Sequence, residues 1–385
     1  MIKLVGGNSL RLLRNGAEYF PALLECIATA QSEVWLETYI FAGDQIGLKI
    51  TAALCCAAQR GAAVRVLIDG FGARDMPQQL REQLRDAGVQ LLVFRPNISP
   101  LTLRRQRLRR MHRKMASVDA RVAFVGGINI IDDDDTPAQM PPRHDFAMRI
   151  EGPLTFAVVD RMETLWGVVA WASLKRRWRA SRKPRGSPPQ TGSQRAALLI
   201  RDNLRHRSDI EDAYLDAISH AREEIIIANA YFFPGRRLRR AIMAAARRDV
   251  RVILLLQGRS DHPLLQLASR ALYGPLLDAG VQIFEFTAGF LHAKVAVCDQ
   301  RWATVGSSNI DPFSLLMARE ANVVVDDLAF TAELRGALRE LMNQGAKPVP
   351  SAQWHSRPML EKLPILAAYL LVRTLMKLFG YGERQ

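Results

Sequence analysis

Two stretches of the chain place a histidine, a lysine and an aspartate at the same spacing. They are MHRKMASVDARVAFVGGINI (111–130), with His112, Lys114 and Asp119, and LHAKVAVCDQRWATVGSSNID (291–311), with His292, Lys294 and Asp299. The chain has seven histidines in 385 residues, so two aligned copies point to a shared purpose. Imidazole beside an ammonium group suits phosphate chemistry, because the lysine supplies charge and the histidine a nucleophile or an acid.

Each stretch continues through an apolar run to glycine and asparagine. Asn129, Asn309 and the hydroxyl of Ser307 are predicted to hold phosphate oxygens, which need several donors. The first copy has Gly127 in place of Ser307, which predicts one hydroxyl fewer in its phosphate cradle. One histidine would attack phosphorus while the other protonates the leaving oxygen, so a single metal-free site would need both copies.

The alternation of side chains along a strand separates the aspartate of each motif from its histidine and lysine. In a strand, side chains alternate between faces, so His112 and Lys114 share one face while Asp119, an odd number of residues away, points elsewhere and begins a turn. The same parity holds in the second copy. The triplets are thus the candidate catalytic residues, with the aspartates pinning the hairpins. A nucleophilic histidine needs a carboxylate to orient it, and Asp145 and Glu320 are the candidates, each about one hairpin beyond a motif.

The elements that must position these residues occur twice in the same order. Helix-to-strand patterns at 30–41, 57–69 and 84–94 have counterparts at 221–233, 245–257 and 276–286. Strands alternating with helices predict an α/β domain with a largely parallel sheet. The length also favours two domains. We predict a first half at 1–180, a linker at 181–194, a second half at 195–345 and a tail at 346–385.

The paired HxKxxxxD pattern, with GGIN in one copy and GSSN in the other, resembles the phospholipase D superfamily over most of residues 20–330. RMHRKMASVDARVAFVGGINI, RHDFAMRIEGP and VGSSNIDPFSLLMAREANVVV resemble bacterial cardiolipin synthases of the B-type branch. The resemblance implies an α/β fold in which two mixed or mostly parallel sheets, flanked by helices, pack pseudo-symmetrically around one active site. It also places Asp145 and Glu320 behind the histidines.

The same resemblance implies a covalent phosphohistidine intermediate, without metal or other cofactor. Two phosphatidylglycerol molecules would give cardiolipin and glycerol. The commoner family arrangement assigns the attack to His112 and the proton transfers to His292. Three alternatives stay open on this scaffold: a phospholipase D-type hydrolase that passes the intermediate to water, a nuclease, and a non-enzymatic tether for anionic lipid.

The net charge of +15 predicts an anionic partner. Cationic runs at 103–114, 175–185 and 236–240 suggest a lipid-facing surface. The apolar stretch at 363–382, which predicts an interfacial helix or a helix docked on the core, and the family resemblance favour a membrane surface over nucleic acid. The resemblance implies that the anionic lipid is phosphatidylglycerol. No run approaches the roughly 20 apolar residues of a spanning helix. We therefore expect a peripheral protein at the cytoplasmic face of the cell membrane. The acidic run 132–135 is predicted to be an exposed loop at the mouth of the site. The sequence does not predict an oligomeric state.

Overall fold

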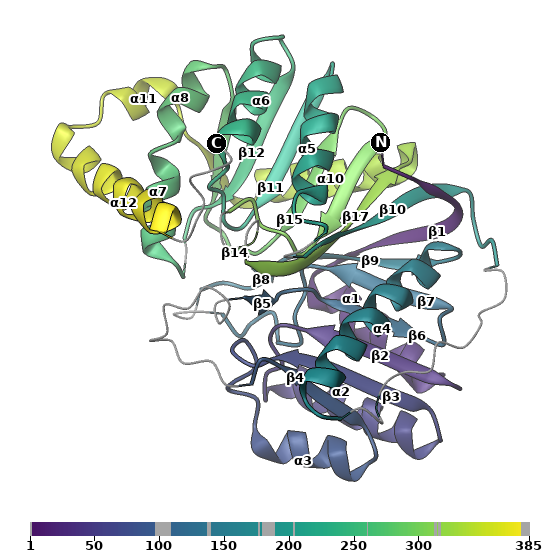
Figure 1. Cartoon of the computed structure of the whole chain (residues 1–385). Helices are drawn as coiled ribbons and strands as arrows, with labels where there is room; N and C mark the ends of the chain where they lie inside the picture. The colour runs from purple at the N-terminus through teal and green to yellow at the C-terminus, as the bar shows by residue number, and fades with distance from the viewer. Residues whose placement is uncertain are drawn as a thin grey trace.

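The computed structural model describes residues 2–96, 109–136, 140–175, 178, 189–202, 205–259, 261–311, 314 and 317–378. Half of the first cationic run (103–108), most of the second and most of the predicted linker lie outside these residues. The two halves follow the same order of elements, the first half in the lower part of Figure 1 and the second in the upper part.

The first half contains nine strands and four helices among its described residues. The strands are β1 (Val5–Arg14), β2 (Glu33–Thr38), β3 (Ala63–Asp69), β4 (Gln90–Phe94), β5 (Arg110–Met111), β6 (Met115–Val118), β7 (Val122–Gly126), β8 (Arg143–His144) and β9 (Phe146–Glu151). The helices are α1 (Asn15–Ala28), α2 (Gln45–Gln59), α3 (Gln78–Asp86) and α4 (Leu154–Ala172). Helix α2 begins where the Asp44 carboxylate accepts the Gly47 N–H at 2.8 Å, a side-chain N-cap.

The second half repeats this pattern and continues into the tail. Its strands are β10 (Gln194–Arg201), β11 (Glu224–Asn229), β12 (Arg251–Gln257), β13 (Gln282–Phe286), β14 (Phe290–Leu291), β15 (Lys294–Cys298), β16 (Trp302–Gly306), β17 (Ala318–Asp326) and β18 (Ala346–Pro348). Its helices are α5 (Asp209–His220), α6 (Arg236–Ala246), α7 (Pro263–Arg270), α8 (Tyr273–Asp278), α10 (Leu328–Gly345), α11 (Ser351–His355) and α12 (Met359–Leu378). Strands such as β11, buried along their whole length, explain the continuous apolar runs in the sequence.

The two expected sheets are joined into one mixed sheet of 16 strands. Within each half the outer strands are parallel, β2–β3–β4 and β11–β12–β13, while the motif hairpins and the strands toward the middle are antiparallel. The join is made by β1, whose residues 9–14 pair with β9 while Val5 and Asn8 pair with β10. The parallel sheet expected from the sequence is therefore confined to the outer parts.

Helices cover both faces of this sheet. One cluster of buried side chains lies beneath α1, α2 and α3, and a matching one lies beneath α5 to α8 and α12. A third cluster spans both halves beneath α4 and α10, since α4 contacts β10 of the second half and α10 contacts β1 of the first. The halves thus share a hydrophobic core, which fixes them relative to each other. In the described part of the chain, no helix is long and apolar enough to cross a membrane.

The motif aspartates lie at the turns of the motif hairpins, as strand parity predicts. Asp119 and Asp299 have positive φ angles of 53° and 46°, a backbone conformation that aspartate tolerates better than most residues. Each carboxylate accepts hydrogen bonds from three successive backbone N–H groups, those of residues 31–33 and 222–224, just where a parallel strand begins. These aspartates tie each hairpin to its neighbouring strand.

We expect Asp119→Ala to destabilise the fold by about 2 kcal/mol, because charged-acceptor hydrogen bonds are lost at a site partly screened by solvent. Burial acts to raise the pKa of Asp119, but the backbone donors outweigh it and hold the pKa below its ordinary value. The stabilisation is therefore present above pH about 4 and is lost as the pH falls through the depressed pKa. Urea unfolding at pH 7 and at decreasing pH measures it. Turnover per folded molecule should fall far less than in His112→Ala; a catalytic loss at unchanged stability would contradict this account.

Candidate active site

The two histidines enter the site along strands of the opposite half. His112 follows β5, which pairs in parallel with β17, and its N–H donates to the Arg319 carbonyl at 2.9 Å. His292 follows β14, which pairs in parallel with β8, and its N–H donates to the His144 carbonyl at 2.8 Å. Each motif is therefore anchored on the strand segment that carries the other half's candidate carboxylate.

Each imidazole is held by a carboxylate from the other half. Nδ1 of His112 lies 3.0 and 3.1 Å from the two carboxylate oxygens of Glu320, and Nδ1 of His292 lies 2.6 Å from Oδ2 of Asp145. Both carboxylates are buried, as expected for groups that act behind a ring. The sequence identified all four residues, but it did not reveal that the pairs form across the halves.

These contacts determine which ring nitrogen remains for chemistry. A carboxylate oxygen accepts hydrogen bonds, so Nδ1 of each neutral ring carries the proton and Nε2 keeps its lone pair. The carboxylate also stabilises the imidazolium form if Nε2 gains a proton. Each ring is therefore built to act through Nε2, either as a nucleophile or as an acid and base.

Two buried lysines bring positive charge to the same place. Lys114 Nζ donates to the His112 carbonyl at 2.6 Å; Lys294 Nζ donates to the His292 carbonyl and lies 3.6 Å from Oδ2 of Asp145. Burial lowers the pKa of Lys114 to about 7 and that of Lys294 to about 8. An anion entering the site would restore their charge, so these ammonium groups are suited to hold a phosphate.

The two histidines differ in their electrostatic surroundings. Burial lowers the pKa of both, but at His112 the Glu320 carboxylate opposes the effect. At His292 the pKa falls well below its ordinary value, because the charges of Lys294 and Arg143 add to burial. The pKa of Glu320 stays below its ordinary value in spite of its burial, owing chiefly to His112. Without a ligand, His292 is the ring more strongly held in its neutral form.

The difference between Gly127 and Ser307 follows from the lengths of the two carboxylates. Ser307 Oγ donates to Oε2 of Glu320 at 2.6 Å, so it supports the longer side chain from behind. A Cβ atom at Gly127 would lie 2.2 Å from Oδ1 of Asp145, so the shorter side chain leaves room only for glycine. We therefore propose a positioning role for Ser307 in place of the phosphate contact predicted from the sequence.

The two asparagines are buried at equivalent positions and remain candidate phosphate ligands. Asn129 Oδ1 accepts the Ile40 N–H at 3.1 Å, which leaves the NH₂ group of this amide as a donor for a ligand. Within the described residues, Asn309 Oδ1 has no hydrogen-bond partner. Only the NH₂ group of this amide can donate to a phosphate oxygen, whereas Oδ1 accepts and would need a donor such as a ligand hydroxyl.

Sequence reasoning missed the aromatic and cationic groups around the rings. Tyr39 packs edge-on against the His112 ring at 4.9 Å between centroids, and Phe290 stacks on His292 at 6.0 Å. The Arg143 guanidinium lies over Phe290, 5.6 Å from its ring centroid. Arg143 stands two residues before Asp145, so the segment RHD contained a further candidate. Tyr39 and Phe290 had no comparable sequence feature, since aromatic residues beside strands are ordinary core residues.

The acidic run expected as an exposed loop is organised around this same arginine. The guanidinium of Arg143 donates to the carbonyls of Asp132 and Asp135, while the Asp133 carboxylate accepts the Gly16 N–H at 2.6 Å. Backbone carbonyls therefore hold Arg143, and one carboxylate of the run is engaged at the start of α1. Among the described residues, no group of three or more His, Cys, Asp or Glu side chains is placed to hold a metal ion.

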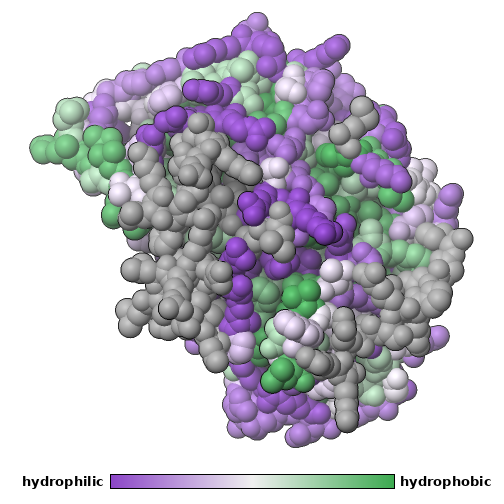
Figure 2. Space-filling model, viewed as in Figure 1, coloured by the Kyte–Doolittle hydropathy of each residue, from purple (hydrophilic) through white to green (hydrophobic). Residues whose placement is uncertain are grey.

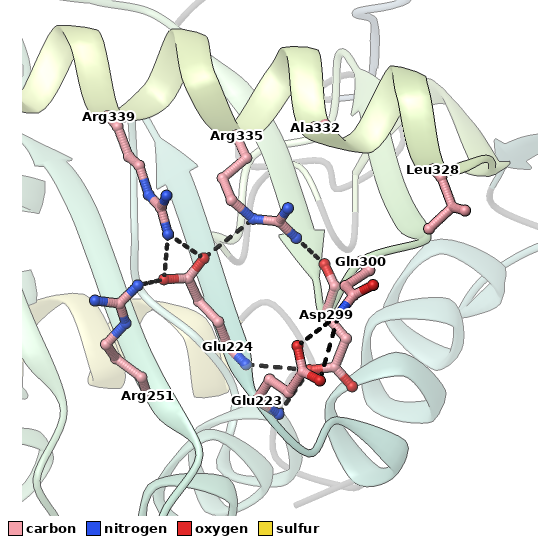
Figure 3. A pocket seen from close by; sticks show the side chains of 9 residues that line it. All are labelled: Glu223, Glu224, Arg251, Asp299, Gln300, Leu328, Ala332, Arg335 and Arg339. Atoms are coloured by element: carbon pink, nitrogen blue, oxygen red, sulfur yellow. Dashed lines mark hydrogen bonds and ion pairs between the residues drawn. The ribbon is translucent and has the colours of Figure 1, made fainter.

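A cavity of about 550 Å³ lies in the second half at the start of β11, the end of that strand farther from Lys294 (Figure 3). Glu224 at the start of β11 is contacted there by three arginines, Arg251, Arg335 and Arg339. Asn229 at the other end of β11 pairs with Lys294, and five residues of strand span about 16 Å. The cavity contains Asp299 but neither histidine, and its arginines are already paired, so it is a structural ion-pair cluster.

The chain is similar in sequence to known cardiolipin synthases. The family model described as "Cardiolipin synthase, PLD-like domain" matches residues 23–134 and 214–342. Cardiolipin synthase B of Escherichia coli K12 is 39% identical over 376 residues, which cover 97% of this chain and 90% of the relative. The major cardiolipin synthase ClsA of Bacillus subtilis is 28% identical over 340 residues, covering 86% and 68%.

The crystal structure of phosphatidylserine synthase from Haemophilus influenzae superimposes with a TM-score of 0.68 at 14% identity, covering 96% of this chain and 94% of that one. At this identity the match shows a shared fold, the duplicated α/β arrangement of phospholipase D-like proteins. Within that class, the chain belongs to the cardiolipin synthase family.

We expect Gly127→Ser to lower kcat at least 100-fold, because the new Cβ displaces the Asp145 carboxylate from His292. Ser307→Ala should lower kcat about 10-fold through a less well held Glu320. Gly336→Ser on α10, where a Cβ meets no atom within 4 Å, is the matched control and should leave kcat unchanged. Steady-state kinetics with circular dichroism as a folding check would measure these effects. Equal activities of the Gly127 and Gly336 variants would contradict the steric argument.

The lysine pKa values predict the pH dependence of substrate capture. Both ammonium groups lose their charge in the free protein as the pH rises through about 7 to 8, so kcat/KM should fall across that range. The acid limb should lie below pH 6.5, because burial lowers the pKa of both histidines. Initial rates with a monomeric short-chain phosphatidylglycerol would give the profile. A kcat/KM that stays constant up to pH 9 would exclude charged lysines as phosphate ligands.

Proposed function

We propose that this protein is a cardiolipin synthase, a phosphatidyltransferase that joins two phosphatidylglycerol molecules into cardiolipin and releases glycerol. The observation that carries the proposal is the pair of histidine–carboxylate contacts formed across the halves, His112 with Glu320 and His292 with Asp145. Burial lowers the pKa of both histidines, and both lysines are close enough to lower it further. Two oriented imidazoles and two buried lysines meet the needs of a two-step phosphodiester transfer.

In the first step, Nε2 of one histidine attacks the phosphorus of the first phosphatidylglycerol. A nitrogen–phosphorus bond forms and the bond from phosphorus to the oxygen of the headgroup glycerol breaks. The other histidine protonates that oxygen, so free glycerol leaves. In the second step, this histidine takes a proton from a glycerol hydroxyl of the second phosphatidylglycerol. The resulting oxygen attacks phosphorus and displaces the first histidine. Lys114, Lys294 and the two asparagines hold the phosphate oxygens throughout.

Two arguments assign the histidines in opposite ways. The commoner family arrangement makes His112 the nucleophile and His292 the acid. The electrostatics of the ligand-free site favour the reverse, because a nucleophile must be neutral and His292 is the ring more strongly held neutral. Glu320 in turn helps His112 to keep a proton. Each assignment places the covalent intermediate on a different, identifiable residue.

The proposed substrate places the protein at the surface of a membrane that contains anionic lipid. A net charge of +15 is complementary to such a surface, and the basic helix α6 contributes four arginines within its 11 residues. We propose peripheral attachment at the cytoplasmic face of the cell membrane. Nucleic acid is the less favoured partner, since the family to which the chain belongs consists of lipid enzymes by name.

Product analysis with radiolabelled phosphatidylglycerol vesicles tests the proposal. We expect labelled cardiolipin and free glycerol from the wild-type protein, and at least a 1,000-fold lower rate from either His112→Ala or His292→Ala. Acid quenching during turnover should leave label on one histidine, which peptide mapping identifies. Phosphatidic acid as the main product would establish a hydrolase instead. Full turnover by either histidine variant would exclude the mechanism.

A further inference from the structure

Helix α12 presents an apolar face that nothing in the described structure covers. Its inner face, which includes Ile365, Ala368 and Val372, is buried in the core of the second half, and the helix packs on α7. Its outer face carries large apolar side chains that are each at least 37% exposed: Met359, Leu360, Leu363, Leu366, Leu370, Leu371 and Leu375. The projecting end of α12 accordingly forms a hydrophobic region at the left of Figure 2.

This face is more than the scattered exposure found on any soluble protein. Seven of the thirteen large hydrophobic side chains that are exposed in the described residues lie on this one helix. Their spacing follows the helical period, so they form a continuous stripe along the helix axis. A contiguous exposed apolar surface with charged residues beside it marks a site of association with a protein or a membrane.

The helix is connected to the active site through a short series of contacts. The Tyr369 ring on α12 lies 5.8 Å from the ring of Phe233, whose N–H donates to the Ile310 carbonyl at 2.6 Å. Ile310 follows Asn309, one of the proposed phosphate ligands. Helix α7, against which α12 packs, starts six residues after the end of β12, and the Gln257 side chain at that end accepts the N–H of Leu291, next to His292. The stripe thus lies on the half of the molecule that carries His292.

The positive charge of this half of the molecule indicates what covers the stripe. Phe233, which packs on Tyr369, leads directly into α6, where Arg236, Arg237, Arg239 and Arg240 lie within five residues. On α12 itself, the Arg373 guanidinium donates to the Tyr369 hydroxyl at 3.2 Å. An apolar stripe on a chain with a net charge of +15 matches a bilayer interface that contains anionic lipid, where leucines enter the acyl region and cations meet phosphates.

We propose that the outer face of α12 docks the protein on an anionic bilayer and brings the active site to the lipid headgroups. This inference rests on the proposed function. A lipid substrate with two acyl chains is most easily attacked at its phosphate while those chains remain in the bilayer. It commits to an anionic lipid surface as the occupant. The alternative, a second copy of this chain, is an outcome of the test.

The test compares two double variants with the same change in charge and nearly the same native exposure. Leu366→Asp/Leu370→Asp alters the stripe, at residues 52% and 54% exposed. Leu48→Asp/Leu328→Asp alters α2 and α10, at residues 51% and 49% exposed. Flotation with vesicles of equal parts phosphatidylglycerol and phosphatidylcholine should show at least a tenfold loss of binding for the α12 variant and wild-type binding for the control. Thermal unfolding confirms that each variant is folded.

Activity measurements separate this inference from the proposed function. The α12 variant should lose at least tenfold in turnover of vesicle phosphatidylglycerol while retaining turnover of a monomeric short-chain phosphatidylglycerol. A wild-type protein that binds vesicles through α12 but forms no cardiolipin would overturn the proposed function and leave the docking face standing. Unchanged flotation of the α12 variant would overturn the docking face. The docking face would also be overturned if the wild-type protein were a dimer and the α12 variant a monomer that still bound vesicles as the wild type does. The stripe would then be an interface between two copies of the chain.

Discussion

The active site depends on two histidine–carboxylate contacts that join the halves of the molecule. Each half supplies one imidazole and the carboxylate for the other half's imidazole, so neither half contains a complete pair. Because a buried carboxylate without its partner is costly, these contacts and the packing of the halves support each other. The two roles that we propose for the histidines, nucleophile and acid, therefore both need the two halves together.

The rest of the fold holds the two halves in the relative position that these contacts require. The continuous sheet through β1 and β10 and the shared core beneath α4 and α10 prevent the halves from sliding. Short parallel pairings, β5 with β17 and β8 with β14, carry each motif to the opposite carboxylate strand. The motif aspartates act at the far ends of the hairpins, where they tie turns to neighbouring strands. Spacing that looks catalytic in the sequence therefore combines a chemical and a structural task.

The approximate twofold symmetry is broken where the chemistry requires two roles. Asp145 with Gly127 and Glu320 with Ser307 are alternative ways to support a histidine, one with a short and one with a long side chain. The surrounding charges lower the pKa of His292 more strongly than that of His112. Two rings with equal surroundings would protonate alike, whereas the proposed transfer needs one neutral and one charged ring at the start of each cycle.

The sequence by itself determined the duplication, the α/β class, the family and the residues of the two motifs, because each depends on local periodicity or on spacing within a few residues. The structure places Asp119 and Asp299 in turns apart from the histidines, as the parity argument predicted, but β6 begins only at Met115, so His112 and Lys114 precede this strand instead of lying in it. Only the tertiary structure decided which carboxylate serves which histidine, why Gly127 is glycine, where Ser307 points, and that the two sheets are one. These features depend on contacts between residues up to 208 positions apart, such as His112 and Glu320, and local patterns carry no information about such contacts.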